Sequence, residues 1–122
     1  MTFLHVCLNV ADAERAVAWY TDQLGFEESW GFEAGDTLNR YVADEDGTEI
    51  QLSETAGETP DDHGNAWDHL AVSVDDVARA VDTIDHHGVV RGPAVVDAAG
   101  ARVAFVRDPD GHVVELIEPL EE

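Results

Sequence analysis

Four polar side chains of the kinds that bind metals recur at one spacing in this sequence. His5 is followed 46 residues later by Gln51, and His69 is followed 46 residues later by Glu115. Two imidazoles, one amide oxygen and one carboxylate suit Zn²⁺, Ni²⁺, Co²⁺, Mn²⁺ or Fe²⁺, and they leave positions open for water or substrate. A lone histidine on a strand is more often structural than a ligand. The shared spacing favours a metal, as does Glu115, a carboxylate in an apolar strand whose charge a cation would compensate.

The shared spacing follows from an internal repeat with an offset of 64 residues. Residues 5–17 align with 69–81, and residues 42–54 align with 106–118, with 12 identities in 26 positions and no gap. A gapless match of this extent indicates a duplicated unit. Two similar units that each contribute two ligands can together build one four-ligand site.

Each repeat is predicted to fold as βαβββ. In the first repeat we expect strands near 3–10, 26–32, 37–43 and 48–54, with a helix that begins after Asp12 as its N-cap and ends before Gly25. In the second repeat we expect strands near 67–74, 89–95, 101–107 and 112–118, with a helix near 75–87. The 122 residues form one domain with modules at about 1–55 and 67–120, and the Gly-, Pro- and Asp-rich residues 56–66 form the linker.

The alternation of side chains along the strands predicts where the candidate ligands point. Apolar residues alternate with polar ones, so the apolar set packs against the helix while His5, Gln51, His69 and Glu115 face the uncovered side of the sheet. All four are therefore expected in one concave cup. Cys7 shares that face, but it lies roughly 6.6 Å along the strand from His5, so we expect it to line the cup rather than bind the metal.

The composition excludes several classes of partner. The chain has 27 acidic residues against six arginines and no lysine, for a formal net charge of −21. Nucleic acids and anionic membranes bind basic patches, so neither is expected as a partner. A lysine-free acidic surface is typical of proteins from salt-accumulating halophiles. No apolar run is long enough to span a membrane and no signal peptide is recognised, while a single cysteine suits the reducing cytoplasm.

The motifs together resemble a known superfamily over essentially the whole chain. They are Leu4-His5 with Leu8 and Val10; the run from Arg15-Ala16-Val17 through Trp19-Tyr20-Thr21 to Leu24-Gly25-Phe26; His69 before LAVSVDD; and Ala104-Phe105-Val106 leading into Asp108-Pro109-Asp110-Gly111 and Glu115-Leu116-Ile117-Glu118. With these motifs the chain resembles the vicinal oxygen chelate superfamily and, within it, the glyoxalase I family.

This resemblance implies a fold, a site and a reaction. The fold is α+β, with two tandem βαβββ modules of the glyoxalase/bleomycin resistance/dioxygenase type. His5, Gln51, His69 and Glu115 match the family's metal ligands, and Glu115 would also be the catalytic base. The reaction is conversion of the hemithioacetal of methylglyoxal and a thiol to an S-2-hydroxyacyl thioester, with one divalent metal ion per site. The substrate is a small thiol adduct of an α-oxoaldehyde, and the family's paired chains imply a homodimer.

Some positions depart from the family pattern and keep alternatives open. Gln51 replaces a glutamate, and this ligand set also resembles that of methylmalonyl-CoA epimerases. Asn9 and Thr55 stand where glyoxalases carry an Arg and an Asn that hold glutathione, so another thiol is possible. Glu49 shares the face of Gln51 and is an alternative carboxylate.

Two further readings concern other classes of protein. In a ring-cleaving dioxygenase, His5, His69 and Glu115 would bind Fe²⁺, whereas a bleomycin-resistance-type binder would lack the metal. The remaining groups weighed for the site are Arg40, Arg102 and Arg107 for a substrate carboxylate, and Trp67 as a wall of the cup or part of the core.

Overall fold

The computed structural model describes residues 1–61 and 65–120 and divides the chain into two compact units, Met1–Asp61 and Asp62–Glu122. In chain order the first unit consists of β1 (His5–Asn9), α1 (Ala13–Leu24), β2 (Glu27–Ala34), β3 (Thr37–Ala43) and β4 (Glu49–Thr55). The second consists of β5 (Leu70–Ser73), α2 (Val77–Thr83), β6 (Val89–Val96), the 3₁₀ turn η1 (Asp97–Ala99), β7 (Ala101–Arg107) and β8 (Val113–Pro119). The prediction of an α+β fold with two tandem βαβββ modules is confirmed.

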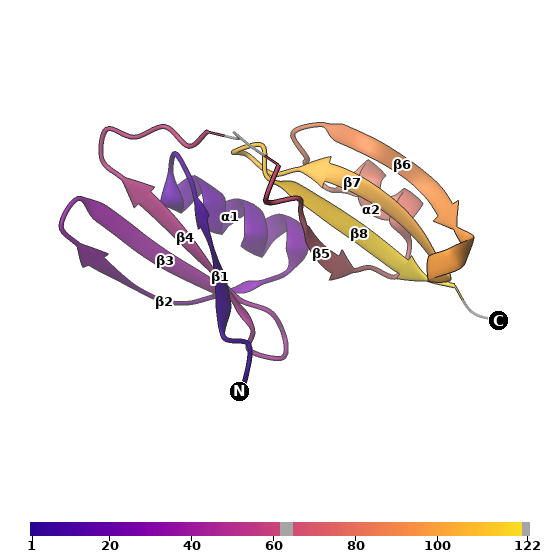
Figure 1. Cartoon of the computed structure of the whole chain (residues 1–122), viewed down its shortest axis with the longest axis horizontal. Coiled ribbons are helices and arrows are strands. Elements are labelled where there is room, and N and C mark those ends of the chain that lie inside the picture. The colour runs from indigo at the N-terminus through magenta and orange to yellow at the C-terminus, as the bar shows by residue number, and fades with distance from the viewer. Residues whose placement is uncertain (62–64, 121–122) are drawn as a thin grey trace. The chain divides into compact units, whose positions relative to one another are not determined.

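The two sheets have the same topology. The strand orders are β1-β4-β3-β2 and β5-β8-β7-β6, with the first and last strand of each unit parallel and the other pairs antiparallel (Figure 1). The parallel pair places residues 44 apart opposite each other, so each candidate histidine lies two positions before the residue opposite its 46-residue partner. Cys7 pairs with Gln51 through β1 and β4, with His5 opposite Glu49, while Ala71 pairs with Glu115 through β5 and β8.

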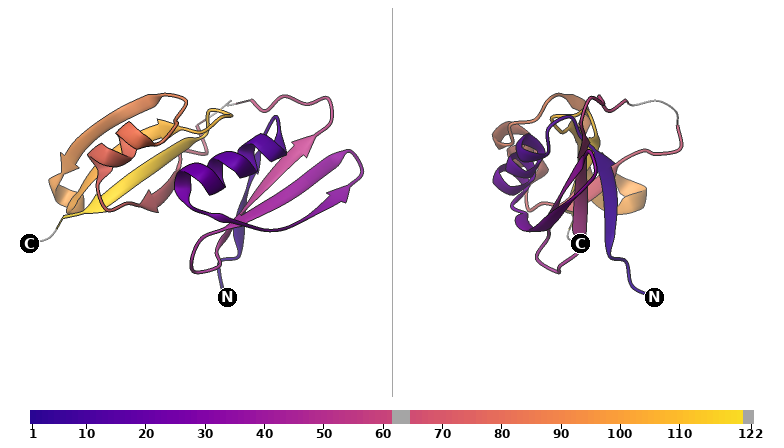
Figure 2. Two further views of the ribbon diagram at one scale, coloured as in Figure 1. Left: turned by 180° about the vertical axis from the view of Figure 1, so that it is seen from behind. Right: turned by 90° about the vertical axis from the view of Figure 1, so that its left-hand side faces the viewer.

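A helix packs against one face of each sheet, and within residues 1–61 and 65–120 no helix lies against the other, here called the uncovered face (Figure 2). The buried side chains on the helix side are apolar: Leu8, Val10, Ala16, Val17, Tyr20, Val42, Ile50 and Leu52 in the first unit, and Val77, Ala104, Val106, Val114 and Leu116 in the second. Burying a Val, Leu or Ile side chain stabilises the fold by roughly 1.5–3 kcal/mol, so this face determines the register of each strand. The polar residues that alternate with them must then face the uncovered side.

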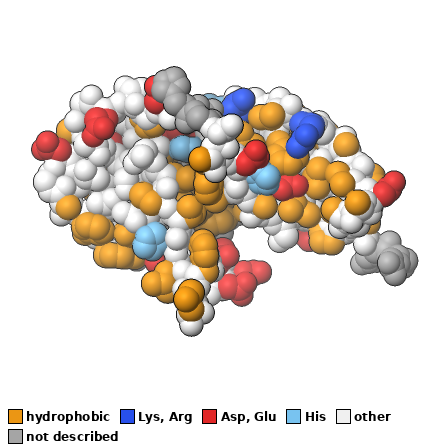
Figure 3. All heavy atoms as spheres, viewed as in Figure 1, with side chains coloured by type: hydrophobic (Ala, Val, Ile, Leu, Met, Phe, Trp, Pro, Cys, Tyr) orange, Lys and Arg blue, Asp and Glu red, His pale blue; other side chains and the backbone are white. Residues whose placement is uncertain are grey.

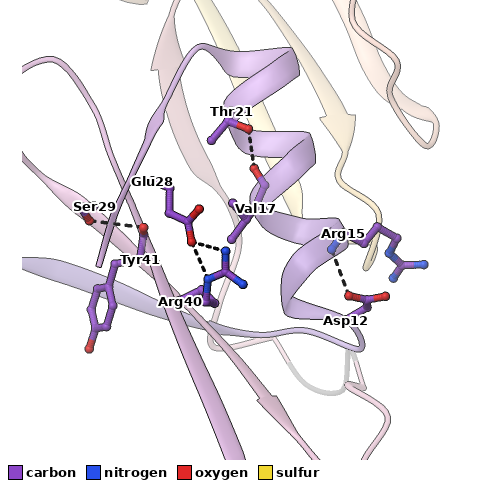
Figure 4. A network of polar contacts seen from close by, with 8 residues as sticks. All are labelled: Asp12, Arg15, Val17, Thr21, Glu28, Ser29, Arg40 and Tyr41. Carbon is purple, nitrogen blue, oxygen red and sulfur yellow. Dashed lines mark hydrogen bonds and ion pairs between the residues drawn. The ribbon is translucent and has the colours of Figure 1, made fainter. Parts of the chain in front are cut away.

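Helix α1 begins and ends where the sequence predicts. The Asp12 carboxylate accepts a hydrogen bond from the Arg15 backbone N–H at 3.0 Å, an N-cap contact drawn in Figure 4. Gly25 follows the last turn with φ of 76°, a left-handed conformation that favours glycine, and its N–H bonds to the Thr21 carbonyl.

Helix α2 is shorter than predicted, since it ends at Thr83 rather than near residue 87. Asp76 caps it as Asp12 caps α1, through the Arg79 N–H at 3.0 Å. Ile84 then turns to an extended backbone with ψ of 132°. Residues 83–87 (Thr-Ile-Asp-His-His) all have modest helix propensity, which explains why the helix does not continue.

Strand β5 is also shorter than predicted, because it begins at Leu70 instead of near residue 67. Leu70 pairs with Val114, and β8 begins only one residue earlier, at Val113. In this parallel pair, at most one residue before Leu70 could therefore find a partner in β8. His69 therefore lies one residue before the strand rather than within it.

Two acidic residues that recur in the repeat have structural roles. Asp44 Oδ1 accepts hydrogen bonds from the backbone N–H groups of Asp46 and Thr48 at 3.0 and 2.9 Å. Its equivalent, Asp108, does the same in the second unit, for residues 110 and 112 at 2.8 and 2.9 Å. These contacts shape the hairpins before β4 and β8, and thereby position residues 51 and 115.

A second recurring pair stabilises the helix N-termini. Glu54 Oε1 accepts from the Ala13 N–H at 2.8 Å, and Glu118 Oε1 accepts from the Val77 N–H at 3.0 Å. A carboxylate in this place satisfies a free N–H group and interacts favourably with the helix dipole. Within residues 1–61 and 65–120, neither helix has the length and apolar character needed to cross a membrane.

Candidate metal-binding residues

The second unit brings two of the four predicted ligands into contact. His69 Nε2 lies 2.9 Å from Glu115 Oε1, and both side chains are mostly shielded from solvent, at 29% and 16% exposed. The other ring nitrogen, Nδ1, lies 2.5 Å from Asp68 Oδ1. A carboxylate on the far side of a histidine ring commonly fixes the orientation of a metal ligand. Asp68 thus helps to orient the His69 ring. The internal repeat does not reveal this residue, because Leu4 stands at the equivalent position of the first unit.

The His69 ring also packs edge-on against Phe105. The ring centroids are 5.1 Å apart with an interplanar angle of 86°. Phe105 is the β7 residue that pairs with Glu115 on β8, so one aromatic residue adjoins both His69 and Glu115. His69 and Glu115 are called the second half-site below. The contact limits the motion of the imidazole without using either ring nitrogen.

The first unit repeats this arrangement with different residues. His5 packs edge-on against Tyr41 at 5.6 Å and 87°, and Tyr41 pairs with Gln51 in the neighbouring strand. Tyr41 and Phe105 are themselves 64 residues apart. Burial raises the pKa of the Tyr41 phenol above its ordinary value of 10.0, and charge on Cys7 and Glu49 raises it further. The phenol therefore stays neutral beside His5 at neutral pH.

The amide of Gln51 is held in one orientation. Its Nε2 donates to Asn39 Oδ1 at 2.9 Å, and Asn39 is buried, with 4% exposed. The Ser53 hydroxyl donates to the same Asn39 oxygen at 2.6 Å. Because the nitrogen is engaged, the amide oxygen is the Gln51 atom left for a metal. Neither Asn39 nor Ser53 was predicted, since strand alternation gives the face of a residue but not its partner.

Two other residues on this face have partners of their own. Cys7 Sγ lies 3.3 Å from the Ser53 hydroxyl, and Glu49 accepts a short hydrogen bond from the Ser29 hydroxyl. Glu49 is therefore engaged away from Gln51, although it remains on the same strand face.

Three arginines that the sequence left as candidates for a substrate carboxylate make contacts within the fold. Arg40 forms an ion pair with Glu28 on the side of the sheet that faces α1, while the Tyr41 ring points away from that pair (Figure 4). Arg102 Nη1 lies 3.5 Å from Glu118, and Arg107 Nη1 donates to the Gly111 carbonyl at 3.1 Å. Trp67 is half exposed, which excludes the core alternative within its own unit.

Each unit by itself offers two of the predicted ligands. Within residues 1–61 and 65–120, no group of three or more His, Cys, Asp or Glu side chains is arranged to hold a metal ion. A histidine nitrogen and a carboxylate oxygen at 2.9 Å are nonetheless donors of the right chemistry, and Gln51 presents a third. The residues fit a divalent metal as two half-sites.

The fold and these half-sites define a class of protein. The family model described as Glyoxalase/Bleomycin resistance protein/Dioxygenase superfamily matches residues 2–116, and the chain belongs to this superfamily.

Particular relatives narrow the comparison. The chain is 35% identical over 125 residues to the lactoylglutathione lyase of Salmonella typhimurium, with 97% of this chain and 93% of the relative covered. Among solved structures, the trypanothione-dependent glyoxalase I of Leishmania major matches with a TM-score of 0.79 and 27% identity, over 97% of this chain and 86% of that one. Glyoxalase I of Zea mays matches with a TM-score of 0.83 and 25% identity over 98% of this chain, which spans 45% of the maize protein.

Proposed function

We propose that this chain is a metal-dependent lyase of the glyoxalase I type. Its substrate is the hemithioacetal formed from an α-oxoaldehyde such as methylglyoxal and a thiol, and its product is an S-2-hydroxyacyl thioester. The observation that carries the proposal is the contact of His69 with Glu115, which puts a metal-binding nitrogen beside a carboxylate able to move a proton. The likeness to lactoylglutathione lyases over nearly the whole chain supports it.

We propose that His5, Gln51, His69 and Glu115 hold one divalent metal ion. The histidines would bind through imidazole nitrogen, Gln51 through its amide oxygen and Glu115 through its carboxylate. When bound, the metal would polarise the substrate oxygens and stabilise the negative charge that develops on them. Nickel, zinc, cobalt and manganese all suit this donor set, and iron would suit the dioxygenase alternative.

The proton transfers fall to Glu115. The carbon that bears the sulfur loses its proton to the Glu115 carboxylate, and the same proton returns to the neighbouring carbonyl carbon. The hydroxyl on the sulfur-bearing carbon loses its proton and becomes the thioester carbonyl, while the former carbonyl oxygen gains a proton and becomes the new hydroxyl. The reaction is therefore an isomerisation that needs no oxidant or reductant. Gln51 cannot accept a proton near neutral pH, so only one side of the site has a base. The reaction should therefore favour one stereoisomer of the hemithioacetal.

The Gln51 amide also keeps an epimerase alternative in view. An epimerase adds a proton on the face opposite to the one it removes, which requires two proton-transfer groups. Glu49, two residues from Gln51 on the same strand face, could be the second proton-transfer group. Its carboxylate, however, accepts a hydrogen bond from the Ser29 hydroxyl. This contact favours the lyase.

We further propose a homodimer in which two chains together complete each site. The first unit exposes large apolar side chains at Met1, Phe3, Leu4, Trp30 and Phe32, a set that an interface would cover. Figure 3 shows hydrophobic side chains over the drawn face, with few basic groups among them. We still expect the protein in the cytoplasm, because a single free cysteine suits a reducing compartment.

The test compares Glu115→Gln with Glu49→Gln, each stripped of metal and reloaded with Ni²⁺, Zn²⁺, Co²⁺ or Mn²⁺. Thioester formation from methylglyoxal and a panel of thiols is the readout. We expect Glu115→Gln to lose ~10²–10⁴-fold in rate at full metal occupancy and Glu49→Gln to stay near the parent rate. Turnover by fully loaded Glu115→Gln at the parent rate would exclude Glu115 as the base. No thioester from any thiol with the parent protein would exclude the lyase.

A further inference from the structure

Tyr41 carries a hydroxyl that its counterpart in the second unit, Phe105, lacks. The two residues are 64 positions apart, and each ring lies edge-on to a candidate histidine ligand, at 5.6 Å from His5 and 5.1 Å from His69. Each also pairs in register with the other candidate ligand of its own unit. Phe105 makes these contacts without a hydroxyl, so the ring alone is enough to pack against the histidine. The Tyr41 hydroxyl is therefore an addition that the packing does not require.

In the part of the chain that the structure describes, the Tyr41 hydroxyl makes no hydrogen bond, although the backbone carbonyl of Tyr41 accepts one from the Ser29 hydroxyl at 3.3 Å. Two other polar side chains of the uncovered face have partners of their own. Cys7 Sγ lies 3.3 Å from the Ser53 hydroxyl, and Glu49 accepts from Ser29. A buried tyrosine usually finds a hydrogen-bond partner for its hydroxyl. Here that partner has to come from outside the unit.

The phenol ring is held in one place, with its hydroxyl towards the uncovered face. Trp30 stacks on the ring with centroids 4.3 Å apart and an interplanar angle of 14°, and Phe32 stacks at 6.3 Å. Tyr41 as a whole is only 4% exposed, yet its hydroxyl oxygen keeps contact with solvent. In Figure 4 the ring points away from the Arg40–Glu28 pair, with the hydroxyl at its far end. A donor fixed in this way needs little reorganisation to meet a developing charge.

The hydroxyl belongs to the same place on the sheet as the candidate ligands of the first unit. Tyr41 pairs with Gln51 on a neighbouring strand about 4.8 Å away, so the two side chains leave the uncovered face side by side. His5 touches the edge of the phenol ring. A tyrosine side chain is longer than a glutamine side chain, so its hydroxyl can reach a substrate that Gln51 and His5 hold through a metal. A phenol O–H is a hydrogen-bond donor at neutral pH.

We propose that Tyr41 is a further catalytic residue, whose hydroxyl donates a hydrogen bond to a substrate oxygen as negative charge develops on that oxygen. The inference rests on the proposed lyase function, in which removal of a proton by Glu115 leaves negative charge on the substrate oxygens. A fixed donor stabilises the charged species more than the neutral substrate, so it accelerates the reaction rather than tightening substrate binding. The proton stays on the phenol oxygen, so the balance of the isomerisation is unchanged.

The test compares Tyr41→Phe with Tyr20→Phe. Tyr41→Phe keeps the ring and should fold, because Phe105 occupies the equivalent place in the second unit, while Tyr20→Phe removes a hydroxyl from α1, outside the site. In metal-loaded protein we expect Tyr41→Phe to lower kcat about tenfold or more, with KM and metal affinity within about twofold of the parent. Tyr20→Phe should keep kcat near the parent value.

A second measurement does not depend on turnover. Acetohydroxamate offers a metal two neighbouring oxygens and carries negative charge when bound, so it stands in for the charged species, whereas imidazole is a neutral metal ligand. Calorimetry with zinc-loaded protein measures the affinity for both. We expect Tyr41→Phe to bind acetohydroxamate about tenfold more weakly than the parent, and imidazole within about twofold, because a hydrogen bond to a charged oxygen is the stronger kind.

Parent-like kcat and parent-like affinity for acetohydroxamate in zinc-loaded Tyr41→Phe would overturn the proposal and leave the lyase function in place. A rise in KM at unchanged kcat would also overturn it, because the hydroxyl would then bind the neutral substrate equally well. So would a parallel loss of metal affinity, since Tyr41 would then only support His5. If the parent turns over no hemithioacetal, the lyase function fails, but weaker binding of acetohydroxamate by Tyr41→Phe still supports the hydrogen bond.

Discussion

The amide nitrogen of Gln51 donates to Asn39 Oδ1 at 2.9 Å, and this contact is specific to the first unit. The equivalents of Asn39 and Ser53 in the second unit are Val103 and Ile117, which belong to an apolar cluster beside Glu115. The difference has a chemical reason. Either oxygen of a carboxylate can bind a metal, so Glu115 needs no partner to choose between them. An amide must present its oxygen and turn its nitrogen away.

This relationship predicts a double-mutant cycle. Asn39→Leu should weaken metal binding about tenfold or more in the parent background, because the Gln51 amide is then free to flip. In the Gln51→Glu background the same change should cost little, since both oxygens of a glutamate are equivalent. Metal affinity by competition with a chelator, together with the visible spectrum of the Co²⁺ form, measures both arms. Equal losses in the two backgrounds would show that Asn39 supports only the fold.

Asp68 should act on the metal through His69. Asp68→Asn keeps the shape of the side chain but weakens the contact with Nδ1, so metal affinity should fall towards tenfold, the low end of such effects because Asp68 is 90% exposed. Asp82→Asn on α2 changes the net charge equally and serves as the control. If both variants lose affinity alike, the loss reflects total charge rather than the orientation of His69.

A shared site predicts that two inactive variants restore each other. His5→Ala and His69→Ala should each abolish metal retention at their own sites. If each site takes its first half from one chain and its second half from the other, a mixed dimer of the two variants has one intact site and one doubly damaged site. Refolding them together should recover about a quarter of the parent activity, since about half of the dimers are mixed. No recovery from a proven mixed dimer would place each site within a single chain.

Much of the fold follows from local patterns in the sequence. Asp12 and Gly25 bound α1 because capping chemistry acts over a few residues, and the alternation in β4 and β8 places Gln51 and Glu115 on the uncovered face. The end of α2 was missed because only weak propensities stop it at Thr83.

The partners of the ligands were harder to predict than the ligands. Asp68 has no equivalent in the first repeat, and Asn39 lies on a strand where only its face could be anticipated. The equivalence of Trp30 and Arg91, which cover the rings of Tyr41 and Phe105, was hidden because the bulges in β2 and β6 break the offset of 64. Repetition reveals what two halves share, whereas the residues that distinguish them depend on contacts between strands.

The acid excess predicts that stability depends on ionic strength. Asp22 and Asp82 lie near the C-terminal ends of α1 and α2, and neither helix has a basic residue in its last turn. A negative charge there opposes the helix dipole as well as the other acids. Repulsion between charges reaches ~10 Å at 0.1 M salt but only ~3 Å at 1 M, because added ions screen it. The melting temperature should therefore rise from 0.1 M to 1 M salt. Asp22→Asn and Asp82→Asn should each add about 0.3–1 kcal/mol to the free energy of unfolding at 0.1 M salt and less at 1 M.

Sucrose provides the control, because it favours the compact state without screening charge. A melting temperature that rises with sucrose but not with sodium chloride would show that self-repulsion does not limit this fold.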